Sequence, residues 1–386
     1  MIQLQSTVNL LFDSTKSISK KDQEGKGIRQ ILEKKQGILR MKTMGKRVNH
    51  AGRTVISPDP LIGTDEVGVP LYIASKLYYP EKVTEFNLEF LKTLTTRGPF
   101  KYPGANQVIS EDGKIISLAN VKDEYRSHIA ENLKVGQIVN RHMQNGDILL
   151  LNRQPTLHKP SIMSHKAKIL KNEKTFRLHY SNCSSYNADF DGDEMNIHFL
   201  QGQIARGEGY HISNSNNQYI VPTSGKPIRG LIQDSVDSSV YLTMKDTFFT
   251  REEYFQLVYA SLEKSLNSHR IRKIVPVAPA ILKPKMLYTG KQIISTIISS
   301  LCTSELVDHI VNAKMSFEHN TKLGKDIWGK GHELEGTIIV RDNEMLTGVL
   351  DKNDIGTSDF GLIHSLYEIY GAELTGELIT TLGKLF

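Results

Sequence analysis

Cysteine is scarce in this 386-residue chain, which contains only Cys183 and Cys302. The two lie far apart and no Cys-x-x-Cys pair occurs, so neither a disulfide framework nor a cysteine zinc site is expected, and a reducing compartment fits best. Long apolar runs are also missing, and the N-terminus lacks the basic region and cleavage site of a signal peptide. The sequence therefore predicts a soluble intracellular protein.

Charge of one sign is not in large excess, since the chain carries 48 Lys and Arg against 42 Asp and Glu. The positive charge is nevertheless uneven, because residues 1–60 hold 12 Lys and Arg against 5 Asp and Glu. Such a basic block is typical either of a solvated face or of a nucleic-acid contact, and a second signal has to decide between them. Length and composition allow two or three domains.

Apolar periodicity predicts helices in both halves of the chain. Residues 28–40 form one candidate, and residues 84–97 form another with Thr84 as its N-cap. A capping box of Thr250 and Glu253 opens a third helix. Further helices are expected at residues 290–301 and 371–386.

Short β-type runs separated by Gly, Asn and Pro turns fill residues 105–200 and predict a compact barrel or sandwich. The runs are Val108–Ile109, Lys114–Leu118, Asp147–Leu151, Lys166–Leu170 and Phe176–His179. Residues 44–60 predict a basic extended segment that ends in a turn. Near the C-terminus, two strands around an Asp342–Asn343 turn lie between helices, so this part is expected to be α+β.

The stretch SYNADFDGDEMNIHF concentrates acidic charge, with Asp189, Asp191, Asp193 and Glu194 inside six positions. Neighbouring carboxylates repel one another unless a cation lies between them. A solvated turn is the first interpretation, because Asp-Gly is a turn dipeptide. The aromatic residues interleaved with the acids do not suit a purely solvated loop.

A calcium loop of the EF-hand type is the second interpretation. Asn187, Asp189, Asp191 and Gly192 would stand at its first, third, fifth and sixth positions. The match fails at the twelfth position, where His198 replaces the bidentate glutamate. The segment before the loop also reads as a strand and not as an entering helix.

A magnesium site for phosphoryl or nucleotidyl transfer is the third interpretation. Asp189, Asp191 and Asp193 at two-residue spacing can direct three monodentate oxygens onto one face of an octahedral ion. Such an ion can lower the pKa of a 3′ hydroxyl and stabilise the charge that builds on a phosphate. The donor set favours this site over the other two.

The string NADFDGDEMN resembles the metal-binding signature of the largest subunit of multisubunit DNA-dependent RNA polymerases. Other segments resemble the same family in the same order along the chain. They are residues 44–60 (its DNA-contacting switch), 67–87 (its dock), 150–170 (the segment upstream of the signature), and 224–234 with 283–296 (its pore). Among the nuclear classes, QLQSTVNLLFD, DTFFTREEY and GLIHSLYEIYG resemble the RNA polymerase I largest subunit most.

The resemblance implies an α+β fold with a double-psi β-barrel active-site domain, a helical dock and an α+β pore domain. The expected division is residues 1–60 for the clamp core and switch, 61–104 for the dock, 105–200 for the barrel and 201–386 for the pore domain. A largest subunit is several times longer, with a zinc-bearing clamp, a bridge helix and a trigger loop elsewhere, so a central fragment is expected. Gly202, Gly207 and Gly209 weaken the helix that the family places after its signature.

By resemblance, the catalytic Mg²⁺ is held by the same three aspartates that the chemistry selects: Asp189, Asp191 and Asp193. The positions that match nucleotide contacts, where amides and guanidinium groups suit sugar and phosphate oxygens, are Asn187, Arg153 and Gln154. The positions that match template-strand contacts, which would grip phosphates without reading bases, are Lys46, Arg47 and Arg53.

Structural alternatives accompany several of these roles. Asn187 could also form a loop-shaping turn, and Arg153 a structural ion pair. His158 is expected to be packed or hydrogen-bonded and not a proton donor. Glu194 is expected to point away from the metal or to support the loop.

The implied activity is Mg²⁺-dependent, DNA-directed RNA synthesis by an assembled enzyme in the nucleus, and within it the nucleolus. Implied partners are the second-largest subunit and other polymerase subunits, a DNA template, an RNA product and nucleoside triphosphates, with no membrane; zinc is expected only in regions outside this segment. Three alternatives stay open: the largest subunit of another nuclear class, a barrel-type RNA-dependent RNA polymerase, and a non-catalytic scaffold that retains the acidic loop.

Overall fold

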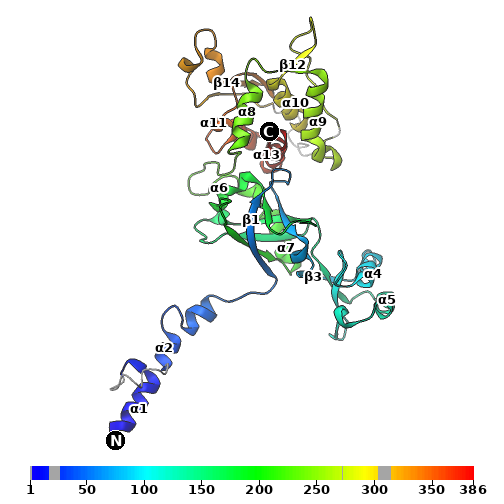
Figure 1. Ribbon diagram of the computed structural model, residues 1–386, viewed down its shortest axis with the longest axis vertical. Coiled ribbons are helices and arrows are strands. Elements are labelled where there is room, and N and C mark those ends of the chain that lie inside the picture. The colour runs from blue at the N-terminus through cyan, green and yellow to red at the C-terminus, as the bar shows by residue number, and fades with distance from the viewer. Residues whose placement is uncertain (1, 17–26, 272, 303–313) are drawn as a thin grey trace. The chain divides into compact units, whose positions relative to one another are not determined.

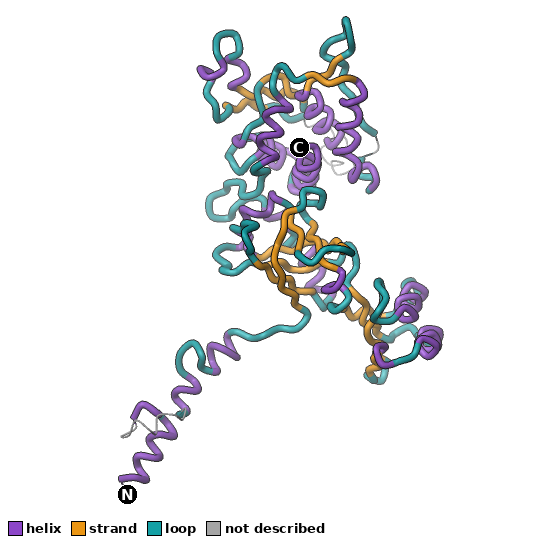
Figure 2. Tube along the Cα trace, viewed as in Figure 1, coloured by secondary structure: helices purple, strands orange, loops and turns teal. Residues whose placement is uncertain are grey.

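The computed structural model describes residues 2–16, 27–271, 273–302 and 314–386. The chain divides into two compact units, Met1–Ala51 and Gly52–Phe386. Figure 1 labels some of the elements along the chain, and Figure 2 separates helices from strands by colour. No helix within the described ranges is long and apolar enough to cross a membrane.

The N-terminal unit consists of short helices. They are α1 (Ile2–Phe12), η1 (Ser14–Lys16), α2 (Ile28–Leu32) and η3 (Leu39–Met44). The carboxylate of Asp13 accepts hydrogen bonds from Arg29 Nη1 and Gln30 Nε2, each at 2.7 Å, and so ties α1 to α2. Hydrogen bonds from Thr15, Gln30 and Arg29 hold the pKa of the Asp13 carboxyl well below its usual range.

The single helix predicted over residues 28–40 is wrong. The helix α2 ends at Leu32, and Lys34 then adopts a left-handed backbone conformation with φ of 66°. A Cβ at Gly37 would lie 2.2 Å from the carbonyl oxygen of Leu32, so only glycine fits this tight turn. A separate π-type helix, η3, begins at Leu39. The apolar periodicity continues across both pieces and conceals the break.

Six strands of the second unit close into a barrel in the order β1-β10-β7-β8-β2-β9. Their bounds are β1 (Ala51–Pro58), β2 (Glu66–Pro70), β7 (Ile148–Asn152), β8 (Ile162–Leu170), β9 (Phe176–Leu178) and β10 (Glu194–Phe199). β1 pairs with β9 and β2 with β8 in parallel, whereas β7 is antiparallel to β8 and β10. The expectation that the runs Val108–Ile109 and Lys114–Leu118 belong to the same barrel or sandwich is wrong, because they lie in a separate sheet. For the other three runs a barrel, one of the two architectures expected, is confirmed. It takes β1 and β2 from before residue 105.

Short helices connect the barrel strands. They are α3 (Leu71–Ala74), η5 (Lys159–Ser161), η6 (Tyr180–Asn182) and α6 (Cys183–Tyr186), followed after β10 by α7 (Gln203–His211). α7 forms despite its glycines. A Cβ at Gly209 would lie 3.0 Å from Leu200 Cδ1 and 3.1 Å from Ile148 Cγ1, so the small residue lets the helix approach the barrel closely. This close packing offsets the weak helix propensity.

A separate four-stranded sheet has the order β3-β6-β4-β5. Its elements are β3 (Tyr78–Lys82), α4 (Leu88–Arg97), β4 (Ala105–Ile109), β5 (Ile115–Ser117), η4 (Leu118–Asn120), α5 (Asp123–Glu131) and β6 (Ile138–His142). The predicted N-cap Thr84 is wrong, because α4 begins at Leu88 after Asn87. The backbone N–H of Thr84 instead donates to Asn87 Oδ1 at 2.7 Å, which closes a turn ahead of the helix.

The C-terminal region of the second unit mixes helices with two small sheets, β11-β12 and β13-β14-β15. Its elements are η7 (Ser215–Gln218), α8 (Asp234–Thr243), β11 (Phe248–Thr250), α9 (Arg251–Asn267), β12 (Leu287–Thr289), α10 (Gly290–Cys302), β13 (Phe317–Asn320), η9 (Lys325–Trp328), η10 (Glu333–Gly336), β14 (Thr337–Arg341), β15 (Glu344–Thr347), α11 (Lys352–Ile355), α12 (Leu362–Tyr370) and α13 (Ala372–Leu385). The capping box of Thr250 and Glu253 is confirmed at the start of α9. The Asp342–Asn343 turn is confirmed between β14 and β15.

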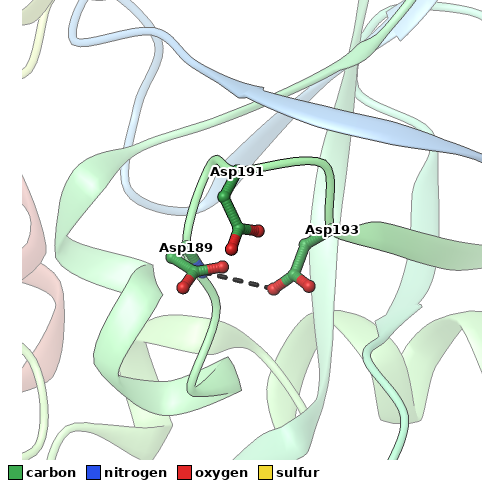
Figure 3. A group of neighbouring side chains, drawn as sticks. All are labelled: Asp189, Asp191 and Asp193. Atoms are coloured by element: carbon green, nitrogen blue, oxygen red, sulfur yellow. Dashed lines mark hydrogen bonds between the residues drawn. The ribbon is translucent and has the colours of Figure 1, made fainter.

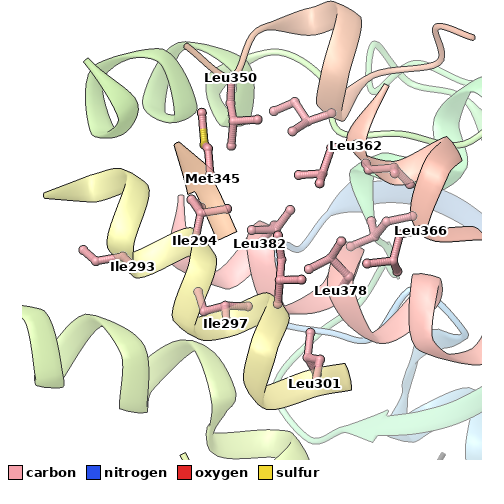
Figure 4. Close-up of a cluster of buried hydrophobic side chains, with 14 of the residues drawn as sticks. Ile293, Ile294, Ile297, Leu301, Met345, Leu350, Leu362, Leu366, Leu378 and Leu382 are labelled. Atoms are coloured by element: carbon pink, nitrogen blue, oxygen red, sulfur yellow. The ribbon is translucent and has the colours of Figure 1, made fainter. Parts of the chain in front are cut away.

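One apolar core holds this C-terminal region together. Side chains from α10, β15, α12 and α13 meet in it (Figure 4). Ile297 and Leu382 are both completely buried there, and α10 is buried on nearly every side because α8, α9, α13 and β15 surround it. Burial on this scale is the main stabilising contribution for a helix that would be marginal in water by itself.

The loop between β1 and β2 anchors this region to the barrel through Thr64. The Thr64 carbonyl oxygen accepts from Asn182 Nδ2 at 2.9 Å and from Arg229 Nη2 at 3.2 Å. The Thr64 N–H donates to Thr380 Oγ1 at 3.2 Å, and its hydroxyl donates to the Gly376 carbonyl on α13 at 3.2 Å. Burial lowers the pKa of Arg229 to about 10, so this guanidinium is still charged at neutral pH. One threonine therefore connects three distant segments.

Replacing Ile297 by alanine is expected to lower the free energy of unfolding by about 2 to 5 kcal/mol, because it leaves a cavity in a closely packed core. Ile204 is 90% exposed and provides the matched control. Ile204→Ala should change stability by less than about 0.5 kcal/mol. Urea denaturation of the two variants measures the difference, and equal losses would contradict the assigned core.

Acid should destabilise the fold through His179. Burial lowers the pKa of His179 to about 3, so the folded state binds fewer protons than the unfolded state between that pH and about 6.5. Its contribution to stability is present above pH 6.5 and is lost as the pH falls toward 3. His179→Asn keeps an acceptor for the Ser181 N–H and removes the titration.

The stability of His179→Asn should therefore vary less with pH between 4 and 6, by about 1.4 kcal/mol per pH unit. Urea midpoints at several pH values measure this slope. His211→Asn replaces an exposed histidine and is the matched control. Parallel slopes for all three proteins would exclude His179 as a source of acid sensitivity.

Candidate metal centre

The aspartate loop, defined as residues 187–193, starts where α6 ends. Asn187 caps α6 in a left-handed conformation, with φ of 47° and ψ of 45°, which asparagine tolerates better than most residues. Gly192 has φ of 125°, a conformation that residues with a side chain rarely adopt. These two positions bend the chain back on itself before β10 begins at Glu194.

Three carboxylates converge inside this bend. One oxygen from each of Asp189, Asp191 and Asp193 lies within 4.8 Å of the others, and the side chains point toward one another (Figure 3). Among the described residues, no other group of three His, Cys, Asp or Glu side chains meets in this way. The donors are all carboxylate oxygens, the ligands that Mg²⁺ and Ca²⁺ prefer, so the set fits a hard divalent cation.

The carboxylates respond to one another's charge. A hydrogen bond shared with Asp191, together with some desolvation and the neighbouring negative charges, raises the pKa of the exposed Asp189. A hydrogen bond from Arg153 has the opposite effect and lowers the pKa of Asp193. The chain thus compensates Asp193 with a cation of its own, whereas Asp189 takes up a proton more readily. A bound divalent ion would replace that proton and remove the repulsion.

The surrounding structure contradicts an EF-hand loop. Strand β9 and two short helical turns precede the loop, and strand β10 follows it, so no helix-loop-helix is present at this place. His198, at the twelfth position, pairs with Leu150 of β7 inside the barrel sheet. A purely solvated turn is also a poor description, because Phe190 packs edge-on against Tyr180 with ring centroids 5.7 Å apart.

Arg153 reaches the aspartate loop from the segment after β7. Its Nε donates to Asp193 Oδ2 at 2.8 Å, and its Nη1 donates to the Tyr186 carbonyl at 3.5 Å. The structural ion pair considered for Arg153 is therefore present. Asn187 is exposed and shapes the loop, as its alternative role required, and Gln154 is exposed beside Arg153. Of the three nucleotide-contact candidates, Arg153 is the one seen in contact with the triad.

The three basic residues predicted as template contacts fall in different units of the chain. Lys46 and Arg47 are exposed and belong to the N-terminal unit. Arg53 lies on β1 in the second unit, where its Nε donates to Glu194 Oε2 at 2.7 Å. Glu194 thus pairs with Arg53 and is not one of the three carboxylates that converge in the aspartate loop.

Sequence reasoning missed two supports of the loop. The backbone N–H of Ile56 on β1 donates to the Asp193 carbonyl at 3.0 Å. The imidazole of His165 on β8 lies 2.8 Å from the hydroxyl of the buried Tyr186. Both partners are far away in the sequence, and nothing in the local residue pattern signals them. The hydrogen-bonded state expected for His158 is confirmed, since its Nε2 lies 2.8 Å from the Ser185 carbonyl oxygen.

Two consecutive parts of the chain match one protein family. Residues 45–215 match RNA polymerase Rpb1, domain 2, and residues 218–386 match RNA polymerase Rpb1, domain 3. The first match includes the barrel and the aspartate loop, and the second includes the C-terminal region. The order of the matches agrees with the order of the segments that carry the sequence resemblance.

Curated relatives are similar over the whole chain. It is 46% identical over 406 residues to DNA-directed RNA polymerase I subunit rpa1 of Schizosaccharomyces pombe, with 100% of this chain and 24% of that relative covered. It is 45% identical over 400 residues to DNA-directed RNA polymerase I subunit RPA190 of Saccharomyces cerevisiae, with 100% and 23% covered.

A polymerase III relative is less similar. DNA-directed RNA polymerase III subunit RPC1 of Saccharomyces cerevisiae shares 38% identity over 363 residues, with 93% of this chain and 24% of that relative covered. The chain therefore spans about a quarter of the length of the curated relatives it matches. Because both domain matches and these identities agree, the chain belongs to the largest-subunit family of DNA-directed RNA polymerases, with the RNA polymerase I subunits among its relatives.

Proposed function

We propose that this chain is the catalytic-core segment of a DNA-directed RNA polymerase largest subunit, of the RNA polymerase I class, and that its aspartate loop holds the catalytic Mg²⁺. The convergence of Asp189, Asp191 and Asp193 carries the proposal. The reaction is the attack of an RNA 3′ hydroxyl on the α-phosphate of a nucleoside triphosphate, directed by a template, with release of pyrophosphate.

The three aspartates would each give one oxygen to the metal ion. When bound, Mg²⁺ would lower the pKa of the 3′ hydroxyl and stabilise the charge that develops on the phosphate. Arg153 holds Asp193 in place and keeps it ionised, because their hydrogen bond favours the charged carboxylate. A ligand carboxylate is therefore already oriented and deprotonated before the ion arrives.

Arg153, Asn187 and Gln154 would contact the incoming nucleotide and the RNA 3′ end. The guanidinium of Arg153 carries five N–H donors, so its bond to Asp193 leaves donor capacity for sugar or phosphate oxygens. The exposed amide of Asn187 stands two residues before Asp189, where it can both donate to and accept from ribose hydroxyls.

Lys46, Arg47 and Arg53 would contact the phosphates of the template strand. The finer architecture proposed from the resemblance is a double-psi barrel, with the β3-β6-β4-β5 sheet and its helices in the dock and the region after residue 200 as the pore domain. Its partners would be the second-largest subunit and other subunits, DNA, RNA and nucleoside triphosphates. The assembled enzyme would act in the nucleus, and within it the nucleolus.

Two other functions compete with this one. A barrel-type RNA-dependent RNA polymerase would carry a similar acidic loop, but the match of residues 218–386 to RNA polymerase Rpb1, domain 3, favours the DNA-directed enzyme. A non-catalytic scaffold would need the fold and not the carboxylates. Substitution of an aspartate in the triad therefore distinguishes the two functions, because only the enzyme needs the carboxylates.

Asp191→Asn in the full-length subunit, assembled into the polymerase, should reduce RNA extension on a primed template at least about a hundredfold. The substitution removes one anionic ligand, and a bound metal contributes several kcal/mol of transition-state stabilisation. Extension rates over a Mg²⁺ titration measure the loss. Subunit assembly and template binding should persist, because Asp191 is exposed and supports no core.

Asp112→Asn is the matched control, since this exposed carboxylate lies in the turn between β4 and β5. It should leave extension within about twofold of the unchanged enzyme. Extension that survives Asp191→Asn would refute the magnesium assignment. If the assembly without substitutions binds the template but does not extend RNA, the scaffold function is supported instead.

A further inference from the structure

The carbonyl groups at the end of α6 are satisfied partly by the backbone that follows and partly by a side chain from another segment. The N–H groups of Asn187 and Ala188 bond to the carbonyls of Ser184 and Cys183, at 3.3 and 2.9 Å. The Ser185 carbonyl is met by His158, whose Nε2 lies 2.8 Å from the oxygen. A carbonyl oxygen accepts and cannot donate, so Nε2 of His158 carries the proton and donates it.

A second histidine secures the neighbouring residue. The Tyr186 hydroxyl lies 2.8 Å from Nε2 of His165, and both side chains are almost completely buried in the barrel. The two histidines belong to the segment that runs from β7 into β8, and they bond to the neighbouring residues Ser185 and Tyr186. The segment before the aspartate loop is therefore bonded to the barrel at two points, the backbone carbonyl of Ser185 and the side chain of Tyr186.

His158 itself is held in place. It precedes the short helix η5, where the Ser161 N–H donates to the His158 carbonyl at 3.1 Å. Pro160 and Ser161 are buried, and η5 packs against α6. The imidazole donor therefore comes from an ordered part of the barrel and can transmit that order to α6.

We propose that His158 is a positioning residue for the metal-binding loop, a role that rests on the function proposed above. Its Nε2–H bond to the Ser185 carbonyl fixes the backbone four residues before Asp189, so that three monodentate carboxylates converge before the ion binds. Without this hydrogen bond, part of the free energy of metal binding is used to order the loop. The affinity for the metal ion is therefore lower. His158 touches neither the ion nor the reacting atoms.

His158→Leu and His158→Gln separate the hydrogen bond from packing. Leucine fills similar space without a donor, whereas the glutamine side-chain N–H₂ can reach the Ser185 carbonyl as Nε2 does. Each variant is made in the full-length subunit and assembled into the polymerase. His128→Leu, an exposed histidine on α5, is the matched control.

Binding of Mn²⁺ is measured by the EPR signal of the free ion, on polymerase without nucleotide. The same titration with Asp191→Asn isolates the part of the isotherm that belongs to the aspartate loop. The Mg²⁺ concentration for half-maximal RNA extension is measured on the same preparations. The first readout reports metal affinity without any catalysis.

His158→Leu should raise the Mn²⁺ dissociation constant and the Mg²⁺ requirement together, by about tenfold, as expected for the loss of a bond that orients metal ligands. Its extension rate at saturating Mg²⁺ should return to near the unchanged value. His158→Gln should recover most of the affinity, and His128→Leu should match the unchanged enzyme.

Several results would overturn the assignment. Unchanged Mn²⁺ affinity in His158→Leu would show that the bond does not position the loop. A slower rate at saturating Mg²⁺ with normal Mn²⁺ affinity would place His158 in contact with substrate. Equal losses in the leucine and glutamine variants would attribute the effect to packing. Failure of the underlying function is distinguishable, because Asp191→Asn would then retain both extension and the full Mn²⁺ isotherm.

Discussion

Mutual repulsion among three carboxylates is the constraint on which the rest of the site depends. Asp189, Asp191 and Asp193 bring their oxygens within 4.8 Å of one another, and Arg153 is the cation that directly neutralises one of them. An isolated peptide would relieve this repulsion by opening the loop. The loop stays closed because both of its ends are bonded to the barrel.

The barrel supplies that rigidity through bonds at each end of the loop. At the far end, Asp193 accepts a backbone hydrogen bond from Ile56, and β10 continues into the sheet between β1 and β7. At the near end, Tyr186 is buried in the barrel interior. A closed sheet cannot slide at an edge, so the positions of its strand ends are fixed by the whole ring of hydrogen bonds. The aspartate loop tolerates the repulsion among its carboxylates because its backbone cannot move to relieve it.

Sequence reasoning identified the three aspartates that converge but not the framework that holds them. The aspartate spacing, the capping box at Thr250 and the Asp342–Asn343 turn are local signals, and all three are present in the structure. Strand partners in the barrel are not local. The parallel pairing of β2 with β8 joins residues about a hundred positions apart, and no periodicity within either strand specifies the other.

The errors follow the same division. The helix predicted over residues 28–40 fails at a left-handed Lys34, and the cap predicted at Thr84 fails because Asn87 closes a turn there. In both places, contacts among a few neighbouring residues decide where the helix ends or begins, although the apolar periodicity of the longer stretch favours a longer helix. Gly209 shows the opposite case, since a residue unfavourable for helices stands where an added Cβ would lie only 3.0 Å from Leu200 and 3.1 Å from Ile148.

Strand β1 bonds to the aspartate loop and also carries Arg53, for which a template contact is proposed above. Ile56 uses its backbone N–H for Asp193, while Arg53, three residues earlier, uses its side chain for Glu194. The Arg53–Glu194 pair is exposed at both side chains, 57% and 45%, and such pairs contribute about 1 kcal/mol or less. A phosphate can therefore take the guanidinium from Glu194 at little cost, whereas the buried backbone bond to Asp193 is kept. Arg53 would thus exchange its ion pair for a template phosphate, while the backbone bond between Ile56 and Asp193 would keep the aspartates aligned.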